Sequence, residues 1–299
     1  MREVRTVGTR CAGALGRLAL VMGSGTLMLV GVGVGGGAAS ATAPVLRMLP
    51  SHLLGPVATT ARTASTSNVS PCWASSNWSG YALSQAAVSG LPCVPASGAT
   101  YTAVTGTWKV PTVTGSRRSA TYSAAWTGID GFTNANLIQA GTEQDYYGGS
   151  AHYTAWWEIL PAPETVIPSM VVKPGDIMIV SIVKGVPNWT ITVTDTTSGK
   201  AFSTSQPYAG AGTSAEWVYE APQVNGRIAT LAHYGSTVFD HGTANTVSPH
   251  LTAGSGGEMV QGYYYGQVVS VPSGPDTGAP VGDGFTSAYG SSIPPAPTS

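Results

Sequence analysis

The chain has 299 residues and few charges: 13 Lys and Arg residues stand against 14 Asp and Glu residues, a charged fraction of 9%. A formal net charge of −1 excludes the basic surface by which proteins hold nucleic-acid phosphates. The 39 glycines and 21 prolines argue against a helical bundle, because both residue types weaken helices. The 8 tryptophans and 13 tyrosines can fill a large core, which argues against disorder.

The first 41 residues have the order of a secretory signal. Four arginines precede an almost uncharged apolar run over residues 18–34, and Ala39, Ser40 and Ala41 end the segment with small side chains. This order is typical of a cleaved signal peptide, although an apolar run of this length also suits a membrane anchor. We expect cleavage, which predicts a secreted, extracellular protein with no membrane association afterwards.

Three further regions follow the signal. Residues 42–70 are rich in Ala, Thr, Ser and Pro without periodicity, which indicates a linker or a short propeptide. Residues 71–271 are patterned throughout and are expected to form one domain, whereas residues 272–299 form a tail rich in Pro, Gly and Ser. We expect this tail to pack poorly, because its composition offers little apolar surface to bury.

The patterned region has a period of two. Apolar and polar residues alternate over 177–183 and again over 189–194, and the turn-forming residues 184–188 and 196–200 follow these two stretches. Turns about every ten residues between alternating stretches are typical of antiparallel strands in a sandwich or jelly roll. The sequence therefore predicts an all-β fold, an antiparallel β-sandwich.

Two cysteines remain once the signal, with Cys11, is removed. Cys72 and Cys93 most simply pair in an exported chain, and closing this loop stabilises the fold by roughly 3 kcal/mol on the chain-entropy model. The alternative is two unpaired buried thiols.

Several common catalytic motifs are absent from the sequence. It contains no Gly-x-Ser-x-Gly elbow, no His-Glu-x-x-His zinc motif and no phosphate-binding loop of the Walker type. Its histidines are scattered, and only His233 and His241 have a spacing that resembles a metal site. Because these two more simply lie on a strand and the turn after it, we expect no metal and no cofactor.

Six segments instead combine polar with aromatic residues: Asn77-Trp78-Ser79-Gly80, residues 104–111 (VTGTWKVP), residues 125–131 (AWTGIDG), Ile138-Gln139-Ala140-Gly141, residues 153–158 (YTAWWE) and residues 215–220 (AEWVYE). In strand geometry Trp156 and Glu158 share a face, as do Glu216 and Glu220. Gln139 lies in an apolar strand, where an unpaired amide is costly. Taken singly, each residue is explained by core packing or by a hydrogen bond to the backbone.

Taken together and in this order, the segments resemble the glutamic peptidases, the eqolisin or G1 family, in its bacterial branch. The resemblance covers roughly residues 75–240 and implies a β-sandwich of two curved sheets and an endopeptidase active in acid. It implies a catalytic pair that maps onto Gln139 and Glu220, with Glu216 as the alternative carboxylate. The residues that match family positions around the cleft, where they would bind substrate, are Trp78, Trp126, Asp130, Trp156 and Glu158.

Elementary acid–base chemistry agrees with such a pair. A histidine base, with a pKa near 6.5, is protonated in acid, whereas a glutamate with a pKa of about 4.3 stays partly ionised there and can deprotonate water. A glutamine is neutral at every pH and can donate an N–H to a developing oxyanion. The sequence departs from the family pattern at Thr154 and Glu143, where members often carry Asp, which leaves pH optimum and specificity open.

Two other functions also suit a β-sandwich with these residues. A secreted glycosidase could use Glu158 and Glu220 as its two carboxylates, but it would not need Gln139. A non-catalytic module could bind sugars or peptides on its tryptophans and tyrosines. If the chain is a peptidase, we expect its partners to be protein or peptide substrates, and we expect it to be a monomer.

Overall fold

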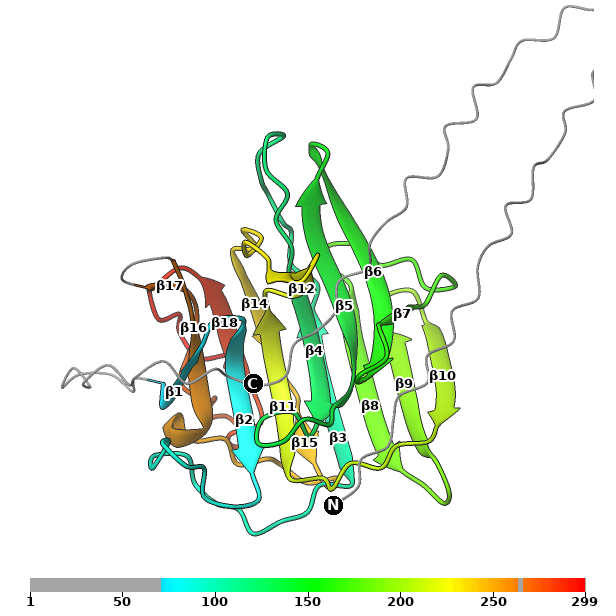
Figure 1. Ribbon diagram of the computed structural model, residues 1–299, viewed down its shortest axis with the longest axis vertical. Helices are drawn as coiled ribbons and strands as arrows, with labels where there is room; N and C mark the ends of the chain where they lie inside the picture. The colour runs from blue at the N-terminus through cyan, green and yellow to red at the C-terminus, as the bar shows by residue number, and fades with distance from the viewer. Residues whose placement is uncertain (1–70, 263–265, 299) are drawn as a thin grey trace, which may run out of the picture. The chain divides into compact units, whose positions relative to one another are not determined.

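The computed structural model describes residues 71–262 and 266–298 (Figure 1). The predicted signal peptide (1–41) and linker or propeptide (42–70) lie outside the described residues. Within the described part, the regular structure is β-strand except for a short 3-10 helix, η1 (Ala253–Ser255). None of the helical structure there is long and apolar enough to cross a bilayer.

One sheet of sixteen strands dominates the fold, and two strands form a second, small sheet. Along the large sheet, the first arm runs in the order β10 (Lys200–Gln206), β9 (Trp189–Asp195), β8 (Ile177–Lys184), β3 (Ala103–Lys109), β14 (Ser236–Phe239), β18 (Phe285–Tyr289), β17 (Gln267–Pro272) and β16 (Gly256–Gln261). The second arm continues with β2 (Trp78–Ser84), β11 (Ser214–Glu220), β4 (Ala124–Ile129), β5 (Ile138–Tyr147), β6 (Ser150–Ile159) and β7 (Thr165–Val166). The remaining strands are β1 (Trp73–Ser75) beside β16, β15 (Thr243–Ala244) beside β3, and the small sheet of β12 (Gln223–Val224) and β13 (Arg227–Ile228).

The two arms pack against each other as the layers of a sandwich. β3 of the first arm contacts β4 of the second, and β5 contacts both β8 and β9. Pairings between the described strands are antiparallel, except for the parallel pair of β1 and β16. The predicted antiparallel β-sandwich is therefore confirmed, with its layers formed by one continuous sheet.

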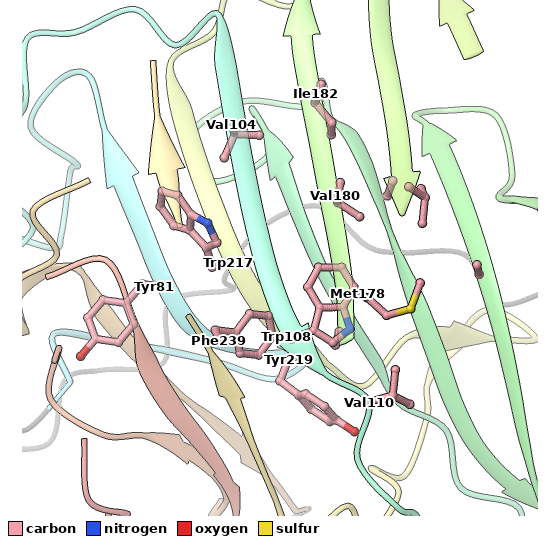
Figure 2. Close-up of a cluster of buried hydrophobic side chains, with 14 of the residues drawn as sticks. Tyr81, Val104, Trp108, Val110, Met178, Val180, Ile182, Trp217, Tyr219 and Phe239 are labelled. Carbon is pink, nitrogen blue, oxygen red and sulfur yellow. The ribbon is translucent and has the colours of Figure 1, made fainter. Parts of the chain in front are cut away.

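Strand alternation places the main core between the arms (Figure 2). On β8, Val180 and Ile182 point into this core, and on β11 Trp217 and Tyr219 do so. The intervening residue Val218 belongs to a second apolar cluster, because successive side chains of a strand point to opposite faces. The second arm therefore has one face in the sandwich core and another face that carries different chemistry.

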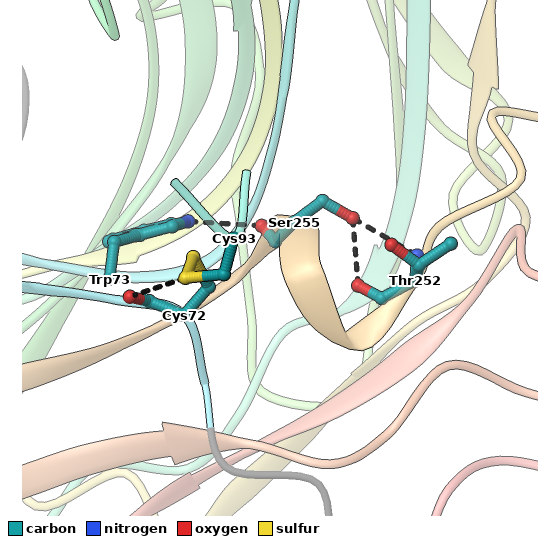
Figure 3. Close-up of a disulfide and its surroundings, with 5 residues drawn as sticks. All are labelled: Cys72, Trp73, Cys93, Thr252 and Ser255. Atoms are coloured by element: carbon teal, nitrogen blue, oxygen red, sulfur yellow. Dashed lines mark hydrogen bonds between the residues drawn. A yellow bond between two sulfur atoms is a disulfide. The ribbon is translucent and has the colours of Figure 1, made fainter. Parts of the chain in front are cut away.

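The predicted disulfide is confirmed. Cys72 and Cys93 are bonded, with their Cα atoms 5.8 Å apart (Figure 3). Beside them the Trp73 indole donates its Nε1–H to the Ser255 carbonyl at 3.0 Å and packs on Phe132 with ring centres 5.4 Å apart. The bridge thus fastens the start of the described chain to the second apolar cluster.

The expectation that residues 272–299 pack poorly is wrong. Strand β18 lies inside the sheet between β14 and β17. Its first residue, Phe285, is buried, stacks on Phe239 with ring centres 4.9 Å apart and packs against the tilted ring of Tyr81 at 4.7 Å. The five-residue strand was hidden in the sequence because the Pro, Gly and Ser residues around it dominate the composition of the tail.

Candidate active site

Three rows of residues cross the face of the second arm that points away from the sandwich core. We call this surface the tryptophan face. Paired residues of neighbouring strands share a face, so the pairing of β2, β11, β4, β5 and β6 defines each row. The first row is Ala82, Glu216, Gly128, Gln139 and Glu158; the second is Gly80, Val218, Trp126, Gly141 and Trp156; the third is Trp78, Glu220, Ala124, Glu143 and Thr154.

The tryptophan face brings together most of the residues predicted from the sequence. Those that lie on it, all of them buried, are Trp78, Trp126, Gln139, Trp156, Glu158 and Glu220. Gln139 and Glu220 stand in the two outer rows, and Trp126 lies between them in the middle row. A polar row therefore flanks an aromatic row on each side.

Glu220 is held by two donors. One carboxylate oxygen, Oε2, accepts the Trp126 Nε1–H at 2.7 Å, and the other, Oε1, accepts an N–H of the Asn77 amide at 3.2 Å. Asn77 is itself buried and accepts a hydrogen bond from the Ser75 hydroxyl at 2.8 Å. Hydrogen bonds from neutral donors stabilise a carboxylate in its charged form without cancelling its charge. This setting suits a carboxylate that works as a base.

Gln139 is oriented by Glu158, the residue opposite it on β6. Its Nε2 donates to Glu158 Oε2 at 2.7 Å, and its Oε1 has no hydrogen-bond partner among the described residues. An ionised carboxylate only accepts, so Glu158 fixes which end of the amide faces it. On the other side stands Gly128, where a Cβ would come within 3.1 Å of the Gln139 Cβ. Glu158 therefore orients one N–H of the amide. The second N–H is on the same nitrogen, and Gly128 has no side chain next to the amide.

The middle row is packed around Trp126. Its ring meets that of Trp78 edge-on, with centres 4.9 Å apart and an interplanar angle of 75°. Gly141 follows Trp126 in the row, and a Cβ there would lie only 2.6 Å from the Trp126 Cβ. The Trp78 Nε1–H has no hydrogen-bond partner among the described residues. It is a buried donor beside Glu220, available to a carbonyl oxygen.

Glu216 has a different environment from Glu220, although both lie on β11 and on the same face. Burial raises the pKa of Glu216 well above its ordinary value, and the charge of Asp130 raises it further. The neighbouring Ser214 side chain and Phe132 backbone lower the pKa, but by less than burial raises it. Glu216 shares a row with Gln139, separated by Gly128. Its surroundings favour a neutral carboxylic acid.

Asp130 lies just beyond the end of β4 and joins two loops. Its Oδ1 accepts from the Asn134 amide at 2.6 Å and the Thr213 backbone N–H at 2.8 Å. Its Oδ2 accepts from the Tyr208 hydroxyl at 2.8 Å and the Gly212 backbone N–H at 2.9 Å. Both oxygens are thus occupied by groups of the chain itself. A substrate-binding role for Asp130 stays a prediction.

The two departures from the family pattern contact each other. Thr154 faces Glu143 across β5 and β6, and its hydroxyl donates to Glu143 Oε2 at 2.8 Å. A hydroxyl beside a carboxylate forms this hydrogen bond without a shared proton, which two carboxylates would need. The two substitutions therefore form one compatible pair in the same row as Glu220.

The sequence analysis did not assign a role to Asn77. The signal was present, because Asn77 begins the first of the six polar and aromatic segments. Its role depends on the pairing of β2 with β11, which brings residues 143 positions apart into hydrogen-bond contact.

Comparison with known proteins gives one family match. The model of the Peptidase A4 family matches residues 76–273 of the chain. This range contains every residue named above on the tryptophan face. None of the curated proteins compared with the chain matches it.

Solved structures show a similar fold. Scytalido-glutamic peptidase, determined with a transition-state analogue inhibitor, matches with a TM-score of 0.55 at 22% identity, over 72% of this chain and 98% of that one. SCP-B, described as a member of the eqolisin family of peptidases and determined with the tripeptide Ala-Ile-His, matches with a TM-score of 0.51 at 22% identity over the same shares. At this identity the likeness concerns the fold.

Proposed function

The chain belongs to the Peptidase A4 family, and from this premise we propose that it is a secreted endopeptidase that acts in acid, with Glu220 as general base and Gln139 as oxyanion donor. The family match confirms the predicted resemblance to glutamic peptidases and makes the chain a peptidase. The bacterial branch stays a prediction.

The observation that carries the assignment of the base is the pair of donors on Glu220. Trp126 and Asn77 each donate a hydrogen bond to one of its oxygens, whereas burial raises the pKa of Glu216 well above its ordinary value. A general base must be ionised when the substrate arrives, and in acid this requirement selects the carboxylate whose surroundings favour the charge. The raised pKa of Glu216 argues against that residue, so we assign the role to Glu220, the other glutamate of the strand.

The proposed reaction is a direct attack of water on the scissile carbonyl. Glu220 takes one proton from the water as the new C–O bond forms, and the carbonyl oxygen becomes an oxyanion. The C–N bond then breaks as Glu220 returns the proton to the leaving amine, which gives a carboxylic acid and an amine. The sequence of steps needs no covalent intermediate and no cofactor.

Gln139 supplies the donor for the oxyanion. One N–H of its Nε2 is held by Glu158, which leaves the second N–H of the same nitrogen for the substrate. Because Glu158 orients the amide before the substrate binds, this stabilisation needs little reorganisation during the reaction. Loss of such a donor typically lowers kcat by about 10²–10³.

Protein or peptide chains are the proposed substrates. The Trp78 Nε1–H, buried and without a partner among the described residues, can bind a substrate carbonyl next to Glu220. The rings of Trp126 and Trp156 provide apolar walls. A substrate that lies across the rows would meet Gln139 and Glu220 on opposite sides of Trp126.

Export and activation belong to the same proposal. The disulfide between Cys72 and Cys93 supports an oxidising destination, since such bonds persist mainly outside the cytosol. We propose that residues 42–70, which are rich in Ala, Thr, Ser and Pro, are a linker or a short propeptide that is removed after export. The glycan-active alternative is not proposed, since the family match is to peptidases.

Digestion of a denatured protein across about pH 2 to 7 tests the function, with a pepsin inhibitor present to exclude aspartic peptidases. The parent, with and without residues 1–70, is compared with Gln139→Ala and Glu220→Gln, and Glu216→Gln is the matched control on the same strand. We expect cleavage in acid that is lost in the first two variants and kept in the control. Cleavage that survives in either Gln139→Ala or Glu220→Gln would refute the assigned pair. No cleavage by the parent, even after removal of residues 1–70, would refute the activity.

A further inference from the structure

A cluster of ligand-type side chains lies away from the tryptophan face. Asp240 and His241 follow β14, and Asp283 precedes β18, two paired strands of the first arm. One ligand atom from each of the three residues lies within 4.8 Å of the others. The backbone holds the two segments together, since the Gly242 N–H donates to the Asp283 carbonyl at 2.7 Å.

His241 Nδ1 forms a hydrogen bond with Asp283 Oδ2, and its spacing to both aspartates is longer than that of a charge-assisted hydrogen bond. His241 Nδ1 is 3.3 Å from Asp240 Oδ1 and also 3.3 Å from Asp283 Oδ2. One Nδ1–H can point at only one acceptor, and a charge-assisted hydrogen bond is normally about 2.7–2.9 Å long. Around a tetrahedral Zn²⁺ with bonds of about 2.0–2.1 Å, neighbouring ligand atoms are ~3.3 Å apart. Both distances at His241 match that spacing.

A second observation also points to a bound cation. The Asp283 side chain is only 3% exposed, and its Oδ1 has no hydrogen-bond partner among the described residues. Asp276 is also buried, and its Oδ2 has no hydrogen-bond partner among the described residues. Buried carboxylate oxygens that gather in this way are normally paired or bound to a metal.

We propose that Asp240, His241 and Asp283 bind one divalent cation of the zinc type. Two carboxylates and one imidazole form a mixed oxygen and nitrogen set, which zinc accepts more readily than the hard cations Mg²⁺ and Ca²⁺. The His241 side chain is 62% exposed, so water can reach the cation and complete its coordination.

The cation has a structural role in this proposal. Asp283 belongs to the C-terminal segment that carries β18, and it lies beyond residue 273, where the family match ends. Asp240 and His241 belong to the body of the first arm. A bound cation would therefore link the C-terminal segment to the rest of the sheet. The two strands next to it, β14 and β18, contribute no residue to the tryptophan face.

Calorimetric titration of the untagged, metal-stripped full chain with Zn²⁺ at about pH 7 tests the site, because metal ligands must be deprotonated and acid weakens such binding. We expect one equivalent to bind and to raise the Tm. His241→Gln changes an exposed side chain, so the fold should be kept, and it should weaken binding at least tenfold. His233→Gln, which alters a histidine outside the cluster, should bind as the parent does. Asp283→Asn should also weaken binding.

Two outcomes would overturn the proposal. One is the absence of saturable binding of Zn²⁺ by the parent. The other is binding that His241→Gln leaves unchanged, which would place the cation elsewhere. Parallel titrations with Mn²⁺ and Ca²⁺ check the ligand chemistry, and preference for Ca²⁺ over Zn²⁺ would contradict a nitrogen ligand. None of these measurements depends on peptidase activity, so the proposed function and this site can fail separately.

Discussion

The two ends of β11 place the same residue type in two different chemical settings. Glu216, near the start of the strand, is buried near another carboxyl group, Asp130, and burial raises its pKa. Glu220, at the end of the strand, receives hydrogen bonds from Asn77 and Trp126. The two residues point to the same face, yet burial raises the pKa of one, whereas the other has a hydrogen-bond donor on each of its oxygens.

The difference indicates that the glutamate nearer to Gln139 in the strand register is not necessarily the one that acts as the base. Glu216 lies in the row of Gln139, whereas Glu220 lies two rows away, beyond Trp126. The donors around each carboxylate are the better guide, because a base is selected by its protonation state at the working pH.

The largest difference in kcat is expected between two separate substitutions, Glu220→Gln and Glu216→Gln. Glu220→Gln removes the base and should lower kcat by about 10²–10⁴. Glu216→Gln replaces a neutral acid with a neutral amide of the same shape and should change kcat by less than about threefold at acid pH. Steady-state kinetics with a peptide substrate, on variants shown to be folded by circular dichroism, measures both. The opposite ranking would make Glu216 the base.

A smaller effect is expected when Glu220 loses one of its donors. Asn77→Ala removes the hydrogen bond to Glu220 Oε1, and kcat should fall by about tenfold, which corresponds to about 1.4 kcal/mol. KM should stay unchanged, because Asn77 acts on Glu220 rather than on the substrate. Asn77→Ser, which can still donate from a shorter side chain, serves as the comparison. A rise in KM with constant kcat would instead indicate substrate binding.

The setting of Glu216 also predicts how stability depends on pH. Its raised pKa means that the folded chain binds this proton more tightly than the unfolded chain does. Stability from this group is therefore complete below the unfolded pKa, about 4.3, and is lost as pH rises toward the folded value. Glu216→Gln removes this loss, so at pH 7 its Tm should exceed that of the parent by about 2–4 °C, with little difference near pH 3. Thermal unfolding at both values, in the Glu220→Gln background to prevent self-digestion, measures it. A gain that is equal at both values would contradict it.

The sequence predicted the layers of the fold better than the arrangement of the site. Alternation over 177–183 and 189–194 identified the strands that became β8 and β9, because a strand with one buried face shows its period directly. β18 was missed, since five residues among Pro, Gly and Ser give too short a signal.

The site required strand pairing that no local pattern contains. The rows exist because β11 pairs with β4 and β4 pairs with β5. This pairing places Glu216 and Gln139 on either side of Gly128 in one row. Local motifs supplied the side chains, but the register across three strands decides which of them meet. The cluster of Asp240, His241 and Asp283 was missed for the same reason. Asp283 is brought to His241 by the pairing of β14 with β18, which the spacing of histidines along the chain does not reveal.

The smallest expected effect concerns the pair of Thr154 and Glu143, in the row of Glu220. Thr154→Asp would replace a donor with a second carboxylate directly opposite the first. Like charges in that position repel when both are ionised, so the variant should lose about 1 kcal/mol of stability near pH 7. Near pH 3 one proton can be shared between the two groups, and the loss should largely disappear.

Thr154→Asn is the matched control, because it has the shape of aspartate and keeps a donor for Glu143. Urea unfolding at both pH values, again in the Glu220→Gln background, should show a pH-dependent loss in Thr154→Asp alone. An equal loss in both variants would mean that the size of the side chain at position 154 matters and its charge does not. A pH-dependent loss confined to the aspartate would explain physically why threonine and glutamate occur together here, since threonine gives Glu143 a hydrogen-bond donor where aspartate would add a like charge directly opposite it.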